Sequence, residues 1–540
     1  MMRLEEGSEL LGGGSVIPIS SSGGKHGSRG RIANVVDNCI DNPKRDQIMK
    51  IALSLAMGNA ADAVEIMCVG FIMTDMGGIS TYHKEFLSAA VFIGMLVGGL
   101  LVGYASDIVG RKPCLQYSLL LNTVAGLISA AAPNIEILIA CRVVGGLGIG
   151  GSVPVVFSLG AEIFPSTSRG KYLSLIASFW MVGAIFTAFS AWVMLGGDLQ
   201  GNKIMPGVHW RPYAVVCALP AIVALLLTHL VVPESPRYLL EKGRLREAAE
   251  VLSAVSCVKC EVADLEEREG QGTVAAAGGV AGSAGLWGQV GGAGAGGVEG
   301  TKVHSPVSTI GLLFRGPLLP LSLPLLLIWF TLSFGSYGLS TWISVLFTDV
   351  GIGNPYAASF IFALANLPGN IISFLFIEVY GRRVLLSAGM CLAAGSALGF
   401  AFDTSIPAVV VLCASLFNAF SVVGWNSLDC LSVECFPTHV RTSAMGLLAA
   451  SGRLGAMSAQ FVNGSLEKNV PLLLFVTSAC SILGGLAAWL LPYDTTGAMS
   501  DVTDVKDEDV DVADVTAEME GETGWSRDSA TYSPIRTSFA

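Results

Sequence analysis

Five ionisable residues interrupt apolar stretches of the sequence that are long enough to cross a membrane. They are Asp62, Glu65, Arg142, Asp429 and Arg453. An ionised side chain at mid-bilayer costs several kcal/mol, so such residues mark ion or ligand pathways by default. The chemistry open to them is ion pairing and the binding and release of protons. For Asp429, which closely precedes Glu434, we favour a solvated charge at the membrane boundary.

Asp62 and Glu65 are three residues apart and therefore share one face of a helix. Two neighbouring carboxylates resist simultaneous ionisation, and burial adds to that resistance, so one of them could hold a proton near neutral pH. Arg142 is one candidate partner for either acid. At about 1.5 Å per residue, Asp62 and Arg453 both lie roughly 18 Å from the inner membrane edge, which makes Arg453 a second candidate. The alternative to proton binding is a static ion pair that fixes helix register.

The elements that must position these residues are transmembrane helices. Hydrophobic residues make up 52% of the 540 residues and charged residues only 14%, with a mean hydropathy of +0.63; soluble chains are about 25% charged. A crossing helix needs about 20 apolar residues. Twelve such runs predict an all-α membrane protein, at 50–73, 85–105, 112–132, 135–159, 171–195, 211–232, 320–347, 355–379, 384–402, 407–432, 442–464 and 470–491.

The distribution of basic residues predicts that both termini lie in the cytosol. With that orientation the outer loops hold only Lys84, Lys203, Arg211 and Lys468, as the positive-inside rule requires. No apolar segment in the first 45 residues resembles a cleavable signal peptide. We therefore expect a multi-pass protein of the plasma membrane or of an intracellular vesicle membrane, with the lipid bilayer as its surroundings.

Five segments follow from this topology. We predict a cytosolic N-terminal segment at 1–49, a six-helix bundle at 50–232, a cytosolic loop with a Gly/Ala-rich linker at 233–316, a second six-helix bundle at 317–492, and an acidic disordered cytosolic tail at 493–540. The start of the loop, 233–255, is predicted to form a charged amphipathic helix.

Two motifs occur once in each predicted bundle. Asp107-x-x-Gly110-Arg111-Lys112 returns as Glu378-x-x-Gly381-Arg382-Arg383, and Glu162-x-Phe164-Pro165-x-x-x-Arg169 returns as Glu434-x-Phe436-Pro437-x-x-x-Arg441. Nearly the same spacing separates the two motifs in each copy. The two bundles are therefore halves that arose from one unit, a plan typical of transporters with a site between the halves.

The repeated charges predict a network at the cytosolic ends of the helices. Gly110 permits a tight turn between antiparallel helices, and Asp107 can fasten that turn or pair with an arginine. Pairs that join the two halves would form in one conformation and break in another. The predicted gating network is Asp107, Gly110, Arg111, Glu162, Arg169, Glu234, Arg237, Glu378, Arg382, Glu434 and Arg441.

These motifs, together with PESPR at 233–237 and the P-x-D-T-x-G ending at 492–497, resemble the sugar and organic-ion porters of the major facilitator superfamily. Asp494 stands where those porters usually have glutamate. Within that group, the sequence Ala61-Asp62-Ala63-Val64-Glu65-Ile66 is similar to the synaptic-vesicle two-related proteins. Tyr337-Gly338 and Arg453-Leu454-Gly455 are similar to them too. The resemblance covers about residues 35–500.

The resemblance implies a major facilitator fold and a secondary active transporter that works by alternating access. Proton-coupled sugar porters place an acid in span 1 against an arginine in span 4, which Asp62 or Glu65 with Arg142 would match. We expect a small polar organic solute and protons as partners, with Arg453 able to bind an anionic group. The predicted proton and substrate site is Asp62, Glu65, Arg142, Arg453, Tyr337, Asn366, Trp425 and Asn426.

The alternative is a membrane sensor or trafficking receptor that keeps the fold without transport, with the acidic tail and linker as its signalling parts. Other classes are disfavoured. Cys257-x-x-Cys260 lacks the second pair that a metal site needs. The glycine run at 145–151 lacks the strand and the Gly-Lys-Ser/Thr of a phosphate loop, and is better explained by close helix packing. We expect no enzyme activity, catalytic residue, metal, cofactor or nucleic-acid partner.

Overall fold

The computed structural model describes residues 28–197, 203–258, 260, 311, 313–314, 318–402, 406–436 and 438–492. Helices account for nearly all of this part of the chain, with two isolated β-bridges, Pro43 to Ser256 and Gly197 to Lys203. The first half contains α2 (Arg45–Met76), α3 (Thr81–Val109), α4 (Arg111–Ala130), α5 (Ile135–Ile163), α6 (Arg169–Leu195) and α7 (Trp210–Val231).

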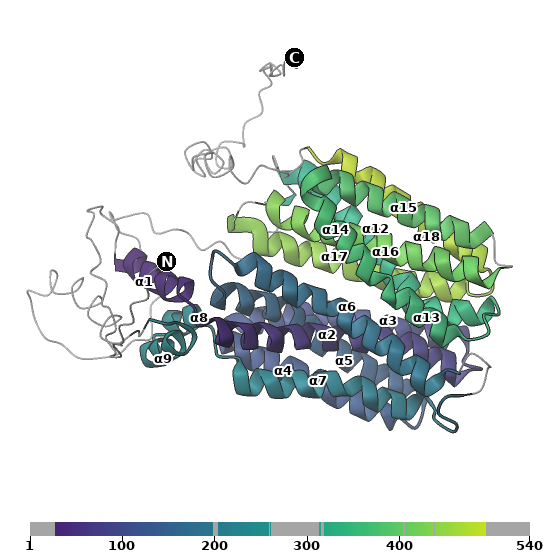
Figure 1. Ribbon diagram of the computed structural model, residues 1–540, viewed down its shortest axis with the longest axis horizontal. Helices are drawn as coiled ribbons and strands as arrows, with labels where there is room; N and C mark the ends of the chain where they lie inside the picture. Colours follow the sequence, from purple (N-terminus) through teal and green to yellow (C-terminus); the bar gives the residue numbers. More distant parts are fainter. Residues whose placement is uncertain are drawn as a thin grey trace, which may run out of the picture.

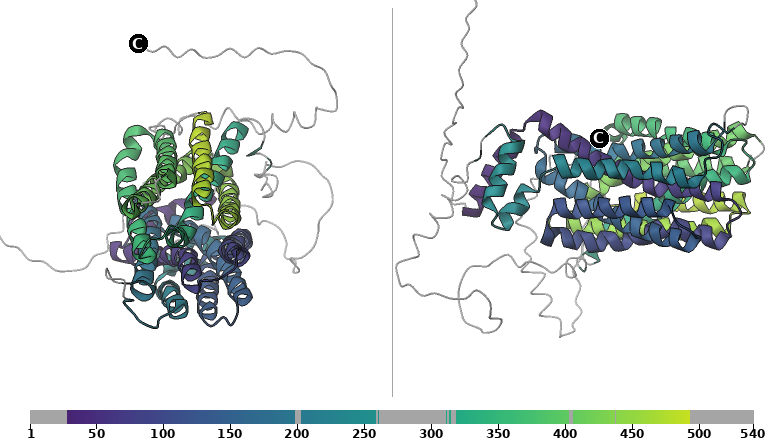
Figure 2. Two further views of the ribbon diagram at one scale, coloured as in Figure 1. Left: turned by 90° about the vertical axis from the view of Figure 1, so that its right-hand side faces the viewer. Right: turned by 90° about the horizontal axis from the view of Figure 1, so that it is seen from below.

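The second half repeats this arrangement, and the two halves lie side by side along their length (Figures 1 and 2). It contains α12 (Leu319–Asp349), α13 (Pro355–Leu364), α14 (Asn366–Tyr380), α15 (Arg382–Phe402), α16 (Pro407–Cys435), α17 (Thr438–Ser465) and α18 (Val470–Ala487), followed by a 3-10 turn at Ala488–Leu490. The predicted all-α architecture of two six-helix halves is therefore confirmed.

Ten helical segments of the described residues are long and apolar enough to cross a membrane. The other two predicted spans, 112–132 and 442–464, correspond to α4 and α17. Both pack lengthwise among the ten (Figure 1). Each carries polar side chains along its length, such as Asn122 in α4 and Gln460 in α17. These polar residues are why their composition is less apolar than that of their neighbours.

The predicted span 355–379 is not one continuous helix, because the chain breaks at Ala365 between α13 and α14. Pro368 has no N–H to donate to the carbonyl four residues earlier, and its ring crowds that carbonyl. Asn366 compensates locally, since its Nδ2 donates to the carbonyl of Ala363 at 2.7 Å.

The predicted amphipathic helix at 233–255 is also divided. It forms α8 (Pro236–Glu241) and α9 (Leu245–Val255), and the turn between them contains Gly243 at φ 71°. Together with α1 (Ser28–Asp41), these helices lie at one end of the bundle (Figure 1). We call this the inner end, because the sequence predicts it to be cytosolic, and we call the opposite end the outer end.

At the inner end each half has its own hydrophobic core. In the first half the core includes Leu55, Leu119 and Leu159. In the second half it includes Leu325 and Leu431. At the outer end, in contrast, residues from both halves form a single core. The two halves are therefore joined mainly at the outer end.

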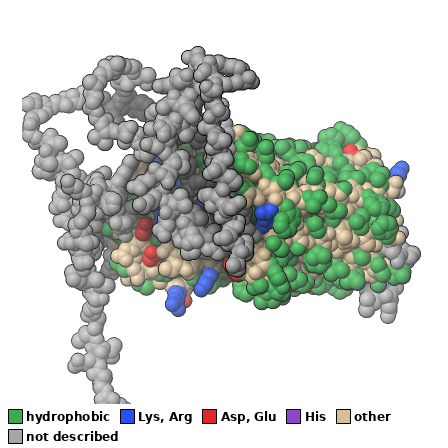
Figure 3. All heavy atoms as spheres, turned by 90° about the horizontal axis from the view of Figure 1, so that it is seen from above, with side chains coloured by type: hydrophobic (Ala, Val, Ile, Leu, Met, Phe, Trp, Pro, Cys, Tyr) green, Lys and Arg blue, Asp and Glu red, His purple; other side chains and the backbone are tan. Residues whose placement is uncertain are grey.

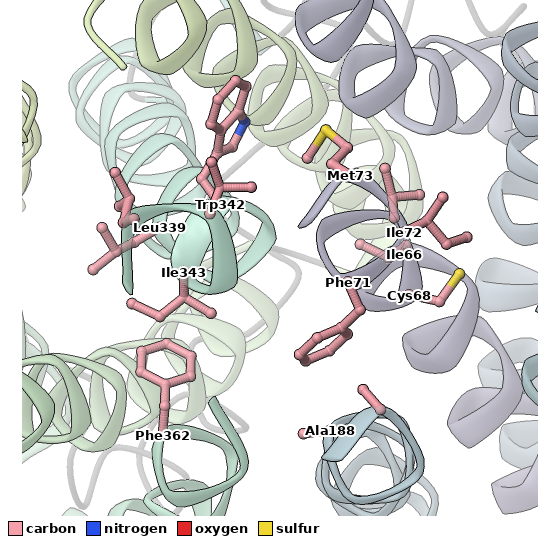
Figure 4. Packing of buried hydrophobic residues seen from close by; sticks show 14 of the residues in the cluster. Ile66, Cys68, Phe71, Ile72, Met73, Ala188, Leu339, Trp342, Ile343 and Phe362 are labelled. Carbon is pink, nitrogen blue, oxygen red and sulfur yellow. The ribbon is translucent and has the colours of Figure 1, made fainter. Parts of the chain in front are cut away.

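Within the outer core, α2, α6, α12 and α13 contribute Phe71, Ala188, Ile343 and Phe362 (Figure 4). Aromatic contacts cross between the halves here, with Trp192 stacked on Phe360 at a centroid distance of 5.4 Å. Helices α2 and α12 also approach very closely. A Cβ atom on Gly70 would lie 2.2 Å from the carbonyl oxygen of Thr341. The outer end is thus tightly closed in this structure.

The glycine run at 145–151 packs α5 against α3, as predicted. A Cβ on Gly146 would lie 2.2 Å from the carbonyl oxygen of Val91, and one on Gly94 would lie 2.2 Å from that of Val143. Side chains would therefore force the two backbones apart. Small residues at such positions are the usual means by which membrane helices make close contact.

The flanks of the bundle are apolar. Large hydrophobic side chains such as Leu100, Leu226, Phe374 and Leu483 are exposed. Figure 3 shows one face on which hydrophobic side chains predominate, with Lys, Arg, Asp and Glu mostly near its ends. An apolar band between charged ends is the surface expected of a protein that spans a bilayer.

Candidate functional site

An ion pair between Glu65 of α2 and Arg142 of α5 lies inside the first half. The two side chains are only 3% and 1% exposed, so the pair is sealed from solvent. Arg142 also donates through Nη2 to Ser129 Oγ and through Nη1 to Cys68 Sγ, the latter at 3.4 Å. A buried pair requires such additional hydrogen bonds to offset the loss of hydration. Of the two acids predicted as partners of Arg142, the structure brings Glu65 to it.

Asp62 lies one turn away on α2 in a different environment. Ser152 Oγ donates to Asp62 Oδ2 at 2.6 Å, and Asn122 Nδ2 donates to Asp62 Oδ1 at 3.4 Å. Asp62 is fully buried. No ion pair joins it to a basic residue of the described chain, although Arg453 is near enough for a Coulombic attraction. Asp62 is therefore a buried carboxyl group whose close partners are neutral.

Tyr337 of α12 lies where the two halves meet. Its ring is 5.5 Å from that of Phe92 and 6.3 Å from that of Trp180, both in the first half. In the second half, its ring is 5.7 Å from that of Trp425. These four aromatic side chains thus form one cluster between α3, α6, α12 and α16, which we call the central aromatic cluster.

Arg453 of α17 borders this cluster, with its guanidinium 6.0 Å from the centroid of the Tyr337 ring. It is half-buried and has no ion-pair partner among the described residues. Both Asp62 and Asp429 are near enough to interact with it electrostatically. Asp429 lies on the exposed face of α16, and its solvation at the membrane boundary stays a prediction. A guanidinium beside an aromatic cluster can bind an anionic or planar group.

Amide side chains continue the site along α14 and α16. Asn426 Nδ2 donates to Asn370 Oδ1 at 3.0 Å, and Asn370 Nδ2 donates to the carbonyl of Asn366 at 2.9 Å. Asn370 Nδ2 also approaches Met181 Sδ of the first half at 3.6 Å. Trp425 is fixed by a hydrogen bond from its Nε1 to Ser336 Oγ at 2.9 Å. Asn366 is the most buried of these amides, and its side chain is used at the break between α13 and α14, where it donates to the carbonyl of Ala363.

Sequence reasoning missed the first-half members of the cluster, Phe92 and Trp180, and the partners of Asp62, namely Asn122 and Ser152. Asn122 offered a signal, because an amide within an apolar span tends to bond between helices. Phe92 offered none, since phenylalanine is ordinary in a membrane span. Only the packing of the two halves distinguishes it.

The repeated motifs meet at the inner end of each half. In the first half, Arg111 Nη2 lies 3.1 Å from Asp107 Oδ1 and 3.4 Å from Glu162 Oε1. Glu234, from the PESPR segment, accepts from the backbone N–H groups of Arg111 and Lys112 at 3.0 and 3.1 Å. A carboxylate on free N–H groups caps the start of α4.

Gly110 makes room for this cap. Its φ of 116° is a conformation that L side chains rarely adopt. A Cβ there would lie 2.4 Å from Glu234 Oε2. The glycine of the motif is thus required both by the turn and by the carboxylate that closes it.

The second half repeats the arrangement. Arg382 binds Glu378 through two hydrogen bonds of 2.8 and 2.9 Å, and its Nε lies 3.3 Å from Glu434 Oε2. Gly381 has φ 88°. Arg111 and Arg382 therefore occupy equivalent places. Each of these ion pairs joins residues of one half.

Three predicted members of the network lie apart from these clusters. Arg237 pairs with Asp37 of α1 at 2.8 Å on an exposed surface. Arg441 donates from Nε to the carbonyl of Phe436 at 3.2 Å. Arg169 begins α6. Asp494, the predicted tail and most of the predicted linker lie outside the described residues.

Two six-helix halves with a polar and aromatic site between them define a membrane transporter fold of the major facilitator type. The family model for the sugar (and other) transporters matches residues 44–499. The chain therefore belongs to this family, which is one of transporters and not of enzymes.

The chain is similar to human synaptic vesicle glycoprotein 2C, with 26% identity covering 82% of this chain and 78% of that protein. It is 27% identical to human synaptic vesicle glycoprotein 2A, over 81% of this chain and 76% of that protein. Among solved structures it resembles the xylose transporter XylE from E. coli in an inward open conformation. The TM-score is 0.61 and the identity 19%, covering 83% of this chain and 97% of that one.

Proposed function

We propose that the protein is a proton-coupled transporter of a small polar organic solute that carries an anionic group. The observation that carries this proposal is the position of Arg453. It lies beside the central aromatic cluster, where the two halves meet, and has no ion-pair partner among the described residues. An arginine without a partner inside a membrane is costly unless it binds something during function.

The substrate would lie against Tyr337 and Trp425, with its anionic group on Arg453. Asn370 and Asn426 supply amide donors and acceptors nearby. Because residues of both halves border this position, rocking of one half against the other would expose it first to one side and then to the other. The outer core and the separate inner cores support an inward-facing state for this structure.

Asp62 is the acid that we propose to carry the proton. Glu65 already has its counter-charge in Arg142, whereas Asp62 has only neutral close partners. A buried carboxylate without a cation is unfavourable, and a proton is the simplest way to neutralise it. A substrate anion bound to Arg453 would neutralise its positive charge, so that Arg453 no longer stabilises the ionised form of Asp62 across the interface. Substrate and proton would then bind together.

Two measurements test the proposal. The first is the thermal stability of the purified protein against sugars, carboxylates, nucleosides, phosphate and organic cations at acidic and neutral pH. A ligand that binds the folded state raises its stability by mass action. We expect a carboxylate or another organic anion to stabilise it, and more strongly at acidic pH. Stabilisation by cations or neutral solutes alone would contradict the substrate class.

The second measurement is uptake of the stabilising solute into proteoliposomes. We expect Asp62→Asn to abolish accumulation driven by a proton gradient while exchange of internal for external solute continues. Glu65→Gln would instead impair both, because it breaks a structural pair. Unchanged driven uptake in Asp62→Asn would exclude this residue as the proton carrier. Localising the protein in cells would show whether it resides in the plasma membrane or in an intracellular vesicle membrane.

A further inference from the structure

The outer end carries an ion pair that joins the two halves. Lys84, in the first turn of α3, binds Glu467, which follows α17. The two side chains are 15% and 11% exposed, so the pair is shielded from solvent. Thr81 Oγ1 lies 3.5 Å from Glu467 Oε2 and supports the same carboxylate. The pair can exist only while the outer ends of α3 and α17 are together.

Two further carboxylates surround this single lysine. Glu85 is half-buried against α17, and a Cβ on Gly464 would lie 2.1 Å from Glu85 Cγ. Asp349, at the end of α12, is exposed. Both acids are close enough to Glu467 to be repelled by it, and Asp349 also feels the attraction of Lys84. Closure therefore brings three negative charges around one positive charge.

The remaining charged groups nearby do not balance this excess. His83 of α3 has its own acidic neighbour, because its Nε2 lies 3.7 Å from Oε1 of Glu136 in α5. Lys468 is exposed and forms no ion pair with the described residues. The aromatic contact of Phe86 with Phe461, at 5.4 Å, adds an apolar flank to the same interface.

We propose that the outer end carries a proton-sensitive lock, which holds it closed when the compartment it faces is acidic. The outer lock consists of Lys84, Glu85, Asp349 and Glu467. Protonation of Glu85 or Asp349 removes a like charge from beside Glu467, whose carboxylate is held by Lys84. In the open state the three acids would separate into water, and the repulsion would be absent with or without a proton.

The sign of the effect follows from this difference. At neutral pH, repulsion among the carboxylates of the outer lock opposes closure, and at acidic pH this repulsion is reduced. Acidification therefore shifts the equilibrium towards the conformation in which the outer end is closed. If closing takes up one proton, the ratio of closed to open molecules changes by up to about tenfold per pH unit. The lock acts on the conformation alone and does not require any particular substrate.

Hydrogen exchange of the full chain in lipid nanodiscs tests the lock. Exchange would be followed at the outer ends of α3 and α17 at mildly acidic and at neutral pH. Because the intrinsic rate of amide exchange depends on pH, the labelling times would be scaled to compensate for it. Protection in these segments reports how often the end opens. We expect several-fold stronger protection at acidic pH. Equal protection across this range would overturn the proposal.

Variants identify the groups responsible. In Glu85→Gln, the outer ends of α3 and α17 are expected to be protected from exchange at both pH values, so most of the pH response is lost. Asp349→Asn should remove a smaller part of that pH response. Lys84→Gln should weaken protection throughout. Glu136→Gln is the matched control, because it lies on the same outer face but pairs within one half. A full pH response in the combined Glu85→Gln and Asp349→Asn variant would also overturn the proposal, whatever solute the protein transports.

Discussion

Glu65 and Arg142 neutralise each other inside the first half, while Asp62, one turn from Glu65 on the same helix, has no basic partner at ion-pair distance among the described residues. Two acids on one helix face thus have different roles. One belongs to a buried ion pair, and the other is the acid that we propose to carry the proton. The distinction depends on the neighbours that α4 and α5 supply.

The first prediction concerns this ion pair. Glu65→Gln should destabilise the protein strongly, because Arg142 would be left buried without its counter-charge; removing one partner of such a pair costs about 3–5 kcal/mol. Replacing both residues, as in Glu65→Gln with Arg142→Met, should recover much of that loss. Thermal unfolding of the purified variants measures both effects.

Glu378→Gln is the control for this comparison. Its carboxylate also binds an arginine but is 70% exposed, and exposed pairs contribute about 0–1 kcal/mol. A melting temperature equally low in Glu65→Gln and Glu378→Gln, or a double variant no more stable than the single one, would argue against the buried pair as a stabilising unit.

The second prediction concerns ligand binding at the junction of the halves. Arg453→Gln should weaken the affinity for an anionic solute by roughly ten- to hundredfold, since a hydrogen bond to a charged group contributes about 1.5–3 kcal/mol. Titration calorimetry with the solute identified by thermal stabilisation measures the change. Arg441→Gln, on the same helix but at its inner end, should bind normally. Similar losses in both variants would move the site away from Tyr337 and its neighbours.

The third prediction concerns helix packing. Gly146→Ala should lower the melting temperature, because the new methyl group would meet the Val91 carbonyl and overpacking costs about 1–3 kcal/mol. Gly395→Ala, where a Cβ would meet nothing within 4 Å, should be neutral or slightly stabilising. If the two variants melt alike, the close contact of α3 with α5 does not limit stability.

Much of this fold follows directly from the sequence. The apolar runs and the repeated motifs predict the helices and the two halves because hydrophobicity and turn chemistry are local properties. The sequence leaves two candidate partners for Arg142, namely Asp62 and Glu65. Depth along a helix can be estimated from the sequence, but the rotation of a helix about its axis, which decides between the two acids, depends on packing. For the same reason the break before Pro368 and the central position of Phe92 required the structure.

The fourth prediction concerns the turn between α3 and α4. Gly110→Ala should expose the bond between Arg111 and Lys112 to trypsin, because a side chain at φ 116° is strained by about 1–3 kcal/mol and would displace Glu234 from the start of α4. Limited proteolysis followed by mass spectrometry of the fragments measures this.

Gly103→Ala is the matched control for the turn. Gly103 lies in α3, the helix that precedes the turn, where a Cβ would meet nothing within 4 Å, so the rate of cleavage should not change. Resistance to trypsin in Gly110→Ala would mean that the turn tolerates a side chain and that the Glu234 cap is not essential to it.

The single core at the outer end also makes the conformation of the protein sensitive to temperature. Opening that end would expose apolar surfaces such as Phe71 and the stacked rings of Trp192 and Phe360. Hydrophobic association weakens on cooling, whereas the described residues of the inner end form no comparable apolar seal between the halves. Cold should therefore release the outer end first, and a preparation cooled before freezing would contain more outward-open molecules than the same preparation kept warm.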